Sequence, residues 1–565
     1  MSKRIVIVGG VAGGATAAAR LRRLDESLEI VMIERGNHIS YANCGLPYHV
    51  GDVIKTKEDL LLQTPEAMLE RYNVDARVRQ EVTSINRNEQ SITIKKLGSG
   101  DTYTLQYDAL VLATGSSPLK PPIPGIDDEG IMTLWTVEDA DRIREYVKES
   151  SVKNAVVVGG GFIGLEMTEN LSELGLDVTL VEMLPQVMAP LDYEMAQILH
   201  ENLEIHGVTL HLNDGVRSFT RDGNGMVVEL ASGKKLGTDL VLLAIGIRPN
   251  SSLARDAGLE LNARGGIVVD EHLRTQDPHI YAVGDVIEVE DFIDKSRTMI
   301  PLAGPANKQA RIVANNIMGA NQRYEGTQGT AVVKVFDTTA AATGANEKTL
   351  QQRGLVRGKD YETSLVIQNS HAGYYGGASP LTMKLIFSVN GDKILGAQMV
   401  GRQGVDKRID VIATAIRLSA SAPQLAELEL AYAPPYSSAK DPVNMAGFVV
   451  ENILSGLVSF APWDALDDEG AAKWTILDVR EKVEVQDYAI PGAINIPLGQ
   501  LRSQLDRLDP EKEVIVFCAV AVRAYNAARI LMGNGFKKVK VYPGGVRFYR
   551  STHYRSEVIQ KRERQ

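Results

Sequence analysis

Short apolar runs alternate with longer amphipathic stretches over the first part of the chain. Residues 4–34 are predicted to form a strand, a glycine-rich turn, a helix and a second strand, and residues 154–182 repeat this order. Later apolar runs at residues 108–115, 239–246 and 279–285 end in glycine or in Gly-Asp, as buried strands before a tight turn do. Strands that alternate with helices predict parallel sheets. The duplication therefore predicts two Rossmann-like, nucleotide-binding units.

The pattern changes twice beyond residue 326. Residues 327–447 mix strands with a helix near 404–420 and a Pro-rich loop at 432–436. Small and acidic residues from 461 to 470 suggest a linker, and residues 472–565 have an α/β pattern long enough for a separate small domain. The predicted fold class is therefore α/β, with two Rossmann-like nucleotide-binding domains, an α+β domain and a small α/β domain.

The length of 565 residues agrees with three or four domains. The expected division is 1–150 with 240–326 for the first nucleotide-binding domain, 151–239 for the second, 327–447 for an interface domain, 448–471 for a linker and 472–565 for the C-terminal domain.

Composition and charge limit the class of function. An apolar content of 44% and a charged content of 23% are those of an ordinary globular protein. The net charge of −10 argues against a general binder of nucleic acid or of anionic membranes. The sequence has no apolar run of membrane-spanning length and only two cysteines. Its first residues enter a predicted strand almost at once, so a signal peptide is not expected. We therefore expect a cytoplasmic protein without nucleic-acid or membrane partners.

The second glycine turn is complete. Gly159, Gly161 and Gly164 fit the spacing G-x-G-x-x-G, which lets backbone N–H groups at a helix N-terminus approach a pyrophosphate. Eighteen residues after Gly164, Glu182 ends the next strand, where a carboxylate accepts hydrogen bonds from ribose hydroxyls and repels a 2′-phosphate. The following residue, Met183, offers no cation. The pattern favours NADH over NADPH.

The first glycine turn is less regular, because Gly9 and Gly14 match while Val11 takes the middle position. Glu34, twenty residues after Gly14, supplies the ribose acceptor, and Asp285 is placed to bond a ribityl hydroxyl. Two nucleotide folds with a thiol after the first indicate FAD in the first unit and a nicotinamide in the second. The residues expected to hold the two cofactors are Gly9, Val11, Gly13, Gly14, Glu34, Arg35, Asn43, Thr114, Gly115, Gly284, Asp285, Gly159, Gly161, Phe162, Ile163, Gly164, Glu182 and Gly246.

The two cysteines both lie in segments that resemble reaction sites. Cys44 lies ten residues past Glu34, and Cys518 follows an apolar strand and opens a six-residue loop that ends at Arg523. The alternative is that both are buried thiols that act as small apolar side chains. Their contexts favour chemistry, and the sequence indicates no metal site.

Residues 1–447 resemble the pyridine nucleotide–disulfide oxidoreductases. The resemblance rests on the two glycine turns, on Ala113-Thr-Gly115 and on Ala282-Val-Gly-Asp285, which occur in the family's order. Members similar to glutathione reductase carry two closely spaced cysteines, whereas this segment has only Cys44. The resemblance therefore implies the single-cysteine branch, which contains NADH oxidases, NADH peroxidases and coenzyme A-disulfide reductases.

Two segments narrow this branch. The oxidases and peroxidases carry a histidine in the first glycine loop, where this chain has Ala12. The segments from Gly9 to Thr16 and from Tyr432 to Asp441 are similar to those of coenzyme A-disulfide reductases. That resemblance implies that Tyr374 and Tyr432 face the active cysteine of the other subunit, and thus a homodimer with 327–447 as its interface.

The same resemblance implies a coenzyme A site, with contacts from Thr16, Arg20, Arg23, Ser40, Asn43, Asn307 and Lys440. Arg20 and Arg23 are three residues apart and share one helix face, where they are suited to bind phosphates. A solvated basic helix face is the alternative. Tyr72 stands where the resemblance would put a lysine.

Residues 474–545 resemble a rhodanese domain, through segments 477–480, 490–497, 518–523 and 542–545. Successive N–H groups after Cys518 would form a nest that stabilises a thiolate or persulfide anion, and Arg523 would attract an anionic sulfur donor. Ala521 replaces the usual glycine, which adds strain if the position needs φ > 0. Tyr488 and Ala489 replace the usual Gly-His. A weak sulfurtransferase or a sulfur receiver is therefore expected.

Together these features predict an NADH-dependent flavoprotein that cleaves the S–S bond of coenzyme A persulfide, polysulfide or disulfide through Cys44. Cys518 would handle sulfane sulfur, with coenzyme A as substrate or carrier. The fused rhodanese favours persulfide, since a disulfide reductase needs no sulfur-transfer domain. One alternative is an NADH oxidase or peroxidase, against which Ala12 argues. The other is a sulfur carrier or redox sensor that works mainly through Cys518.

Overall fold

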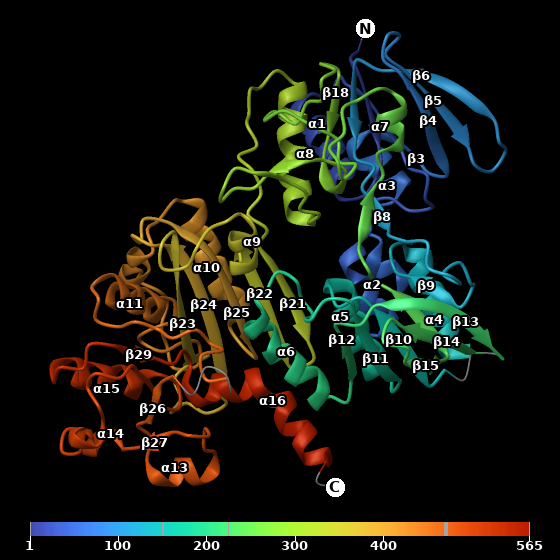
Figure 1. Cartoon of the computed structure of the whole chain (residues 1–565). Helices are drawn as coiled ribbons and strands as arrows, with labels where there is room; N and C mark the ends of the chain where they lie inside the picture. Colours follow the sequence, from blue (N-terminus) through green and yellow to red (C-terminus); the bar gives the residue numbers. More distant parts are fainter. Residues whose placement is uncertain (1, 150–151, 224, 468–472, 564–565) are drawn as a thin grey trace. The chain divides into compact units, whose positions relative to one another are not determined.

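A computed structural model describes residues 2–149, 152–223, 225–467 and 473–563 (Figure 1). The chain divides into two compact units. The first unit contains Met1–Pro185 and Val208–Gly329, and the second contains Gln186–Gly207 and Thr330–Gln565.

The first unit begins with a parallel five-stranded sheet of order β18-β7-β1-β2-β3. Its strands are β1 (Arg4–Val8), β2 (Glu29–Ile33), β3 (Val74–Arg77), β7 (Ala109–Leu112) and β18 (Ile280–Ala282). Helices α1 (Ala12–Leu24) and α8 (Ala303–Ile317) lie side by side against it. Strands β1, β2, β7 and β18 are almost wholly buried, as in parallel sheets covered on both faces, which explains their continuous apolar runs, whereas the edge strand β3 is only partly buried.

A second five-stranded parallel sheet has the order β12-β11-β10-β16-β9. Its strands are β9 (Ile131–Thr133), β10 (Asn154–Val158), β11 (Asp177–Glu182), β12 (Thr209–Leu212) and β16 (Leu240–Leu243), and α5 (Phe162–Glu173) follows β10. Strands β9 and β16 lie outside the expected range of 151–239. Strand β16 belongs here because it pairs directly with β10.

Smaller elements complete the first unit. One antiparallel sheet consists of β4 (Gln80–Asn86), β5 (Ser91–Lys96) and β6 (Thr102–Gln106), and another of β13 (Val216–Asp222), β14 (Gly225–Leu230) and β15 (Lys235–Thr238). Two strand pairs are β8 (Ser116–Pro118) with β17 (Ile247–Pro249) and β19 (Val289–Glu290) with β20 (Arg297–Thr298). The helices are α2 (Leu46–Val50), α3 (Pro65–Tyr72), α4 (Val137–Glu149) and α7 (Ser252–Asp256).

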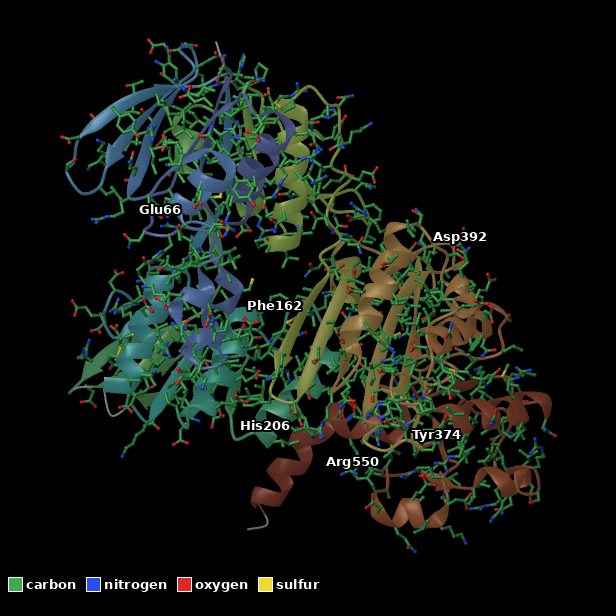
Figure 2. The ribbon with its side chains drawn as sticks, turned by 180° about the vertical axis from the view of Figure 1, so that it is seen from behind. Glu66, Phe162, His206, Tyr374, Asp392 and Arg550 are labelled. Carbon is green, nitrogen blue, oxygen red and sulfur yellow. The ribbon has the colours of Figure 1, made fainter. Side chains whose placement is uncertain are left out.

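The second unit contains an antiparallel sheet of order β21-β22-β25-β24-β23. Its elements are β21 (Ala331–Val335), β22 (Thr338–Gly344), β23 (Tyr361–Asn369), β24 (Pro380–Ser388), β25 (Ile394–Gly401), α9 (Glu347–Gln352), α10 (Val405–Arg417) and α11 (Pro442–Leu454). Helix α6 (Tyr193–Ile205) also packs here, although it lies between β11 and β12 in the sequence. Just after α6, the ring of His206 (Figure 2) stacks on Phe336 with 4.3 Å between centroids.

The C-terminal part of this unit has a parallel sheet of order β27-β26-β28-β29. Its elements are β26 (Thr475–Asp478), β27 (Ile494–Asn495), β28 (Val514–Phe517), β29 (Val539–Val541), α13 (Lys482–Asp487), α14 (Leu498–Leu501), α15 (Val522–Gly533) and α16 (Gly545–Glu563).

The expected linker at 448–471 is largely structured. Helix α11 continues to Leu454, and Phe460 forms a bridge with Val541. Of the acidic run, residues 468–470 lie outside the described residues. Ser551 Oγ on α16 donates a hydrogen bond of 2.8 Å to Glu201 on α6. The small domain is therefore packed on its neighbours within the unit.

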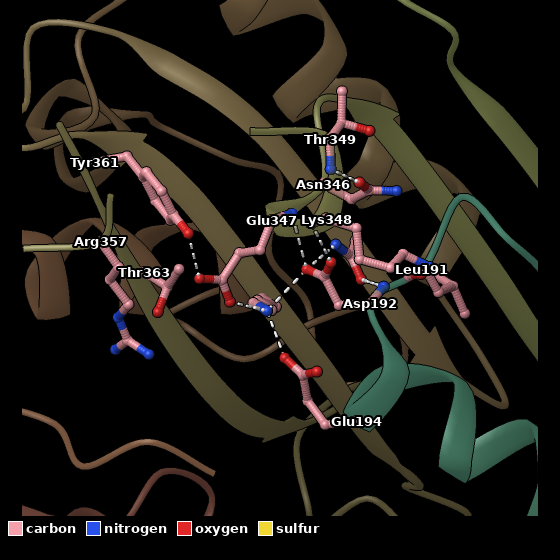
Figure 3. A network of polar contacts seen from close by, with 12 residues as sticks. Leu191, Asp192, Glu194, Asn346, Glu347, Lys348, Thr349, Arg357, Tyr361 and Thr363 are labelled. Atoms are coloured by element: carbon pink, nitrogen blue, oxygen red, sulfur yellow. Dashed lines mark hydrogen bonds and ion pairs between the residues drawn. The ribbon is translucent and has the colours of Figure 1, made fainter. Parts of the chain in front are cut away.

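A buried charge cluster joins three elements of the second unit (Figure 3). The Lys384 side chain on β24 is 3% exposed, and its Nζ donates hydrogen bonds to Asp192 (2.8 Å), Glu347 (2.5 Å) and Glu194. Burial alone would lower the pKa of Lys384, but the carboxylates of Glu194, Asp192 and Glu347 outweigh it and raise that pKa. Burial raises the pKa of Glu194. The cluster fixes α6 and α9 on the sheet.

We expect Lys384→Met to lower the free energy of unfolding by about 3–5 kcal/mol, because it leaves buried carboxylates without a cation. The midpoint of urea unfolding, followed by tryptophan fluorescence, measures the loss. Lys393→Met, at an exposed lysine between β24 and β25, is the matched control and should leave the midpoint unchanged. Equal midpoints for the two variants would contradict the importance of the cluster.

Candidate redox and sulfur-transfer sites

Both glycine turns depend on a close approach between strand and helix. A Cβ added to Gly14 would lie 1.8 Å from the carbonyl oxygen of Gly9, and one on Gly164 would lie 1.8 Å from that of Gly159. Gly9 and Gly159 have φ of 102° and 108°, which favours glycine. The sequence therefore permits the same strand-to-helix turn twice, with the helix N-terminus directly over the strand end.

The middle position of the motif is glycine in one turn and valine in the other, and both residues are compatible with the turn. A Cβ on Gly161 would meet no atom within 4 Å, so this side of the α5 N-terminus is open to a ligand. Val11 is the N-cap of α1 and has φ of −91°, which a valine adopts without strain. Both helix N-termini thus present unpaired N–H groups, which suit a pyrophosphate.

Glu34 and Glu182 lie at equivalent places beside the two turns. Glu34 accepts hydrogen bonds from the N–H groups of Gly10 (2.8 Å) and Gly36 (2.7 Å). Glu182 accepts them from Gly160 (2.7 Å) and Leu184 (2.8 Å). These bonds aim each carboxylate along the carboxyl edge of its sheet, where ribose hydroxyls of a bound dinucleotide lie.

Asp285 lies at the carboxyl end of the first sheet, in the turn after β18. It accepts a 2.7 Å hydrogen bond from Ser116 Oγ, and burial raises its pKa. The preceding Gly284 donates its N–H to Gln309 on α8 (2.8 Å), and Thr114 Oγ1 donates to the carbonyl of Asn250 (2.8 Å). Segments far apart in the sequence therefore meet where FAD is expected.

Cys44 is exposed and lies in the short helical turn Asn43–Gly45. Helix α2 follows at once and packs against α4 and α5. The approach is close at Gly51, where an added Cβ would lie 1.9 Å from the side-chain oxygen of Asn170 on α5. The packing of α2 on α5 therefore brings Cys44, which follows the βαβ segment of the first nucleotide-binding domain, close to the first helix of the second.

Glu166 on α5 lies in the environment of Cys44, and sequence reasoning did not single it out. Tyr48 Oη donates to Glu166 Oε1 at 3.3 Å. Burial, together with Glu169 and against the Tyr48 bond, raises the pKa of Glu166 to about 7. Desolvation by the surrounding protein, then the Glu166 and Asp285 carboxylates, raise the pKa of Cys44. A carboxyl group able to exchange protons near neutral pH thus accompanies the thiol.

The expected coenzyme A contacts gather partly on α1 and α8. Thr16 Oγ1 and Asn307 Oδ1 are 2.5 Å apart, and Arg20 Nε donates to Asn315 Oδ1 at 2.9 Å. Tyr72, which stands where a lysine was expected, lies under Arg23, with 5.3 Å from the guanidinium carbon to the ring centroid.

The remaining expected contacts are more dispersed. Asn43 is exposed beside Cys44, and Ser40 has φ of 48° in the preceding loop. Lys440 is exposed and belongs to the second unit. The coenzyme A role of all these residues is a proposal.

Tyr374 (Figure 2) and Tyr432 are joined in the second unit by a hydrogen bond of 2.8 Å between their hydroxyls. Both side chains are exposed, at 78% and 48%. The hydrogen bond to Tyr432 raises the pKa of Tyr374. Two large exposed aromatic side chains held together in this way are typical of a recognition surface.

Cys518 is 1% exposed and follows β28 directly. Within the described chain, the N–H groups of residues 519–521 have no hydrogen-bond partner, and the α15 N-terminus follows. The Cys518 carbonyl accepts the N–H of Val546 (2.8 Å), and a Cβ on Gly545 would lie 2.2 Å from that carbonyl oxygen. The loop therefore has the expected anion-binding form, and the glycines of 542–545 allow its close support.

Ala521 adopts φ of 76° and ψ of −18°, in the left-handed region. This is the conformation in which an alanine at this loop position adds strain, since its Cβ crowds the following carbonyl. The sequence expectation was conditional on φ > 0, and the structure meets that condition.

Arg523 is paired in a way the sequence did not indicate. Its two terminal nitrogens each donate to an oxygen of Glu484 at 2.7 Å. Arg480 is likewise paired with Asp478 inside the domain. Glu484 lies 39 residues before Arg523, so only the packing of α13 against the loop shows the pair.

Among the described residues, one group of three acidic side chains lies close enough to hold a metal ion, namely Asp192, Glu194 and Glu347. The ammonium of Lys384 already neutralises it. No described helix combines the length and apolar character that crossing a membrane requires.

Comparison with known proteins identifies the family. Residues 3–310 match "Pyridine nucleotide-disulphide oxidoreductase", residues 330–442 match the dimerisation domain of that family, and residues 463–551 match "Rhodanese-like domain". The chain belongs to the pyridine nucleotide-disulphide oxidoreductases. Proteins of this family depend on FAD and NAD(P)H. The matches to the oxidoreductase, dimerisation and rhodanese-like domains confirm the predicted α/β fold class of this chain.

Three relatives within this family illustrate the match. A coenzyme A disulfide reductase from Staphylococcus epidermidis is 35% identical over 446 residues, which is 79% of this chain and 99% of the relative. The structure of reduced CoADR-RHD from Bacillus anthracis is 50% identical, with a TM-score of 0.95 and coverage of 98% and 99%. That of an NAD-dependent persulfide reductase from A. fulgidus is 38% identical, with a TM-score of 0.89 and coverage of 97% and 100%.

We expect Glu166→Gln in this oxidoreductase to lower the pKa of Cys44, although burial still holds it above its usual value, because a carboxylate that forms near pH 7 no longer opposes the thiolate. The pH dependence of Cys44 alkylation by iodoacetamide, read by peptide mass spectrometry, measures that pKa. Glu173→Gln removes a charge from the exposed end of the same helix and should change nothing. An unchanged alkylation profile in Glu166→Gln would contradict the coupling.

Ala521→Gly should stabilise the loop by about 1 kcal/mol, because glycine adopts φ of 76° without a Cβ clash. Hydrogen exchange of the α15 amides reports this gain as slower opening. Ala519→Gly, at a position without positive φ, should instead accelerate exchange, since it only adds flexibility. If both variants accelerate exchange, Ala521 is not strained.

Proposed function

We propose that the protein is an NADH-dependent flavoprotein reductase that cleaves the S–S bond of coenzyme A persulfide or coenzyme A disulfide through Cys44. Cys518 is proposed to handle sulfane sulfur. The observation that carries the proposal is that the two cysteines of the chain belong to different sites, Cys44 to the nucleotide-binding unit and Cys518 to the loop after β28 in the other unit. With no resolving cysteine beside Cys44, the second sulfur of its redox cycle comes from the substrate.

The two glycine turns have the donor sets that the cofactors need. The turn at Gly9 with Glu34 and Asp285 suits FAD, and the turn at Gly159 with Glu182 suits NADH. FAD, when bound, supplies the electrons of NADH to the sulfur at Cys44. NADH is preferred over NADPH, since Glu182 is already held toward the ribose position and the side chains after it are Met183 and Leu184, which carry no charge.

Cys44 and Glu166 are the protein groups proposed to carry out the cleavage of the substrate's S–S bond. The Cys44 thiolate attacks one sulfur of the substrate, a bond forms between the two sulfurs, and the substrate's own S–S bond breaks with its electron pair on the leaving sulfur. Glu166, with a pKa of about 7, accepts the thiol proton before attack and returns a proton afterwards. The raised pKa of Cys44 makes such a base necessary at neutral pH.

Assembly and substrate binding complete the proposal. Residues 330–442 match a dimerisation domain, and the exposed pair Tyr374 and Tyr432 is suited to face Cys44 of a second subunit and to protonate the leaving sulfur. Coenzyme A phosphates would bind the basic face with Arg20 and Arg23. The named relatives, a coenzyme A disulfide reductase and a persulfide reductase, support both substrate classes.

Anaerobic NADH turnover with coenzyme A persulfide and with coenzyme A disulfide tests this function. We expect activity on both, a preference for NADH over NADPH, and a loss of at least about a hundredfold in Cys44→Ser, which removes the nucleophile. Cys518→Ser should leave disulfide reduction intact and lower the turnover of sulfane sulfur from a separate donor.

The alternatives give different results in the same assay. Steady NADH consumption with oxygen or peroxide alone, undiminished in Cys518→Ser, would make the protein an oxidase or peroxidase. Full sulfur-handling activity in Cys44→Ser would make it a sulfur carrier or sensor that works through Cys518. Equal rates on both coenzyme A substrates, without any effect of Cys518→Ser, would remove the preference for persulfide.

A further inference from the structure

The cation expected to attract an anionic sulfur donor at Cys518 is already neutralised. Arg523 closes the loop that Cys518 opens, and both of its terminal nitrogens bind Glu484 at 2.7 Å. This two-point geometry is the strongest that an arginine and a carboxylate form. The two side chains are about one-third exposed, at 32% and 33%, so the pair lies at the surface of the domain beside the loop.

Glu484 is held in place by its own helix. Its Oε2 also accepts the N–H of Glu481, which completes a capping box at the start of α13. The hydrogen bond from Arg523 is the main cause that lowers the pKa of Glu484 to about 2. The carboxylate is therefore charged at neutral pH, and its orientation costs little extra conformational entropy.

The neighbouring arginine offers no substitute. Arg480 is almost fully buried and paired with Asp478, and it donates its remaining bonds to the carbonyls of Glu484 and Tyr488. Arg480 and Arg523 are therefore both matched by carboxylates. The Arg523 guanidinium also interacts with the Cys518 thiol. Anion stabilisation at the sulfur bound to Cys518 therefore comes from the N–H groups of the loop together with a guanidinium whose charge Glu484 offsets.

We propose that Glu484 determines which sulfur donors Cys518 accepts: by pairing with Arg523 it excludes small dianionic donors such as thiosulfate and leaves the site to thiol persulfides. The proposal rests on the role of Cys518 as a sulfur-transfer thiol given above. Glu484 is a positioning residue, because it acts through Arg523.

The two donor classes differ in where charge accumulates. With thiosulfate, the Cys518 thiolate attacks the outer sulfur, a Cys518 persulfide anion forms, and the S–S bond of the donor breaks to release sulfite, a dianion that needs a nearby cation. With a thiol persulfide, the thiolate attacks the terminal sulfur, which keeps its proton, and the other sulfur leaves as a thiolate. Both reactions balance without an added oxidant or reductant.

Coenzyme A persulfide fits this restriction. Its phosphates lie at the far end of a long uncharged arm, so the group that enters the loop carries no dianion. A paired Arg523 removes the attraction for thiosulfate while it leaves the arm unaffected.

The test compares Glu484→Gln with Asp487→Asn in the full-length protein. Both remove one negative charge from α13, but Asp487 is 80% exposed and does not contact Arg523. Persulfide formation on Cys518 is measured by the mass of the intact protein after reaction with thiosulfate or with glutathione persulfide. We expect Glu484→Gln to raise kcat/KM for thiosulfate about tenfold, through KM, and to change that for the persulfide less than about twofold.

Two further measurements distinguish an effect of the unpaired Arg523 charge from a loss of structure. The gain with thiosulfate should shrink as ionic strength rises, since it depends on an exposed cation. It should vanish in the double variant with Arg523→Gln. An equal gain in Asp487→Asn, or none in a Glu484→Gln protein that keeps its persulfide rate, would overturn the proposal. Absence of any Cys518 persulfide from either donor would instead refute the sulfur-transfer role itself.

Discussion

The close contact between strand and helix in the two glycine turns is the constraint on which the rest of the structure depends. In each turn the first helical turn rests on the carbonyl oxygen of the strand-end glycine, at a distance that excludes even a methyl group at Gly14 or Gly164. This contact brings a helix N-terminus over the carboxyl edge of a parallel sheet. Both nucleotide sites, and the carboxylates of Glu34 and Glu182 beside them, follow from it.

The thiol chemistry depends on a second contact, between helix α2 and helix α5. Because α2 begins two residues after Cys44, its packing on α5 carries the thiol into the environment of Glu166. The result is a thiol that favours its neutral form near pH 7, beside a carboxyl group that is about half ionised at that pH. Such a site can both accept a proton from the thiol and donate one, which suits a reaction that releases a thiolate or sulfide.

Charge is handled differently in the second unit. Lys384 and its three carboxylates form a buried network that fixes helices on a sheet, where an unpaired charge would be very costly. Arg523 and Glu484 form a pair that is about one-third exposed and contributes little to stability, so its main effect is on the electrostatic field beside Cys518. The same chemistry of opposite charges thus serves architecture in one place and selectivity in the other.

The sequence by itself determined the features that depend on neighbouring residues. The turn at Gly159, the strand from Asp177 to Glu182 and the loop after Cys518 were all predicted, since apolar periodicity and glycine positions act over a few residues. The alternation of strands and helices predicted the α/β fold class, and the family resemblance added the rhodanese-like domain; the comparisons confirm both.

Only the tertiary structure decided which distant segments meet. It placed β9 and β16 in the second sheet, packed most of the expected linker, and brought Glu166 to Cys44 and Glu484 to Arg523. These partners are separated by tens to more than a hundred residues, and no local pattern encodes such pairs. Their contacts arise from how whole helices and sheets pack, which depends on the shape of the entire core.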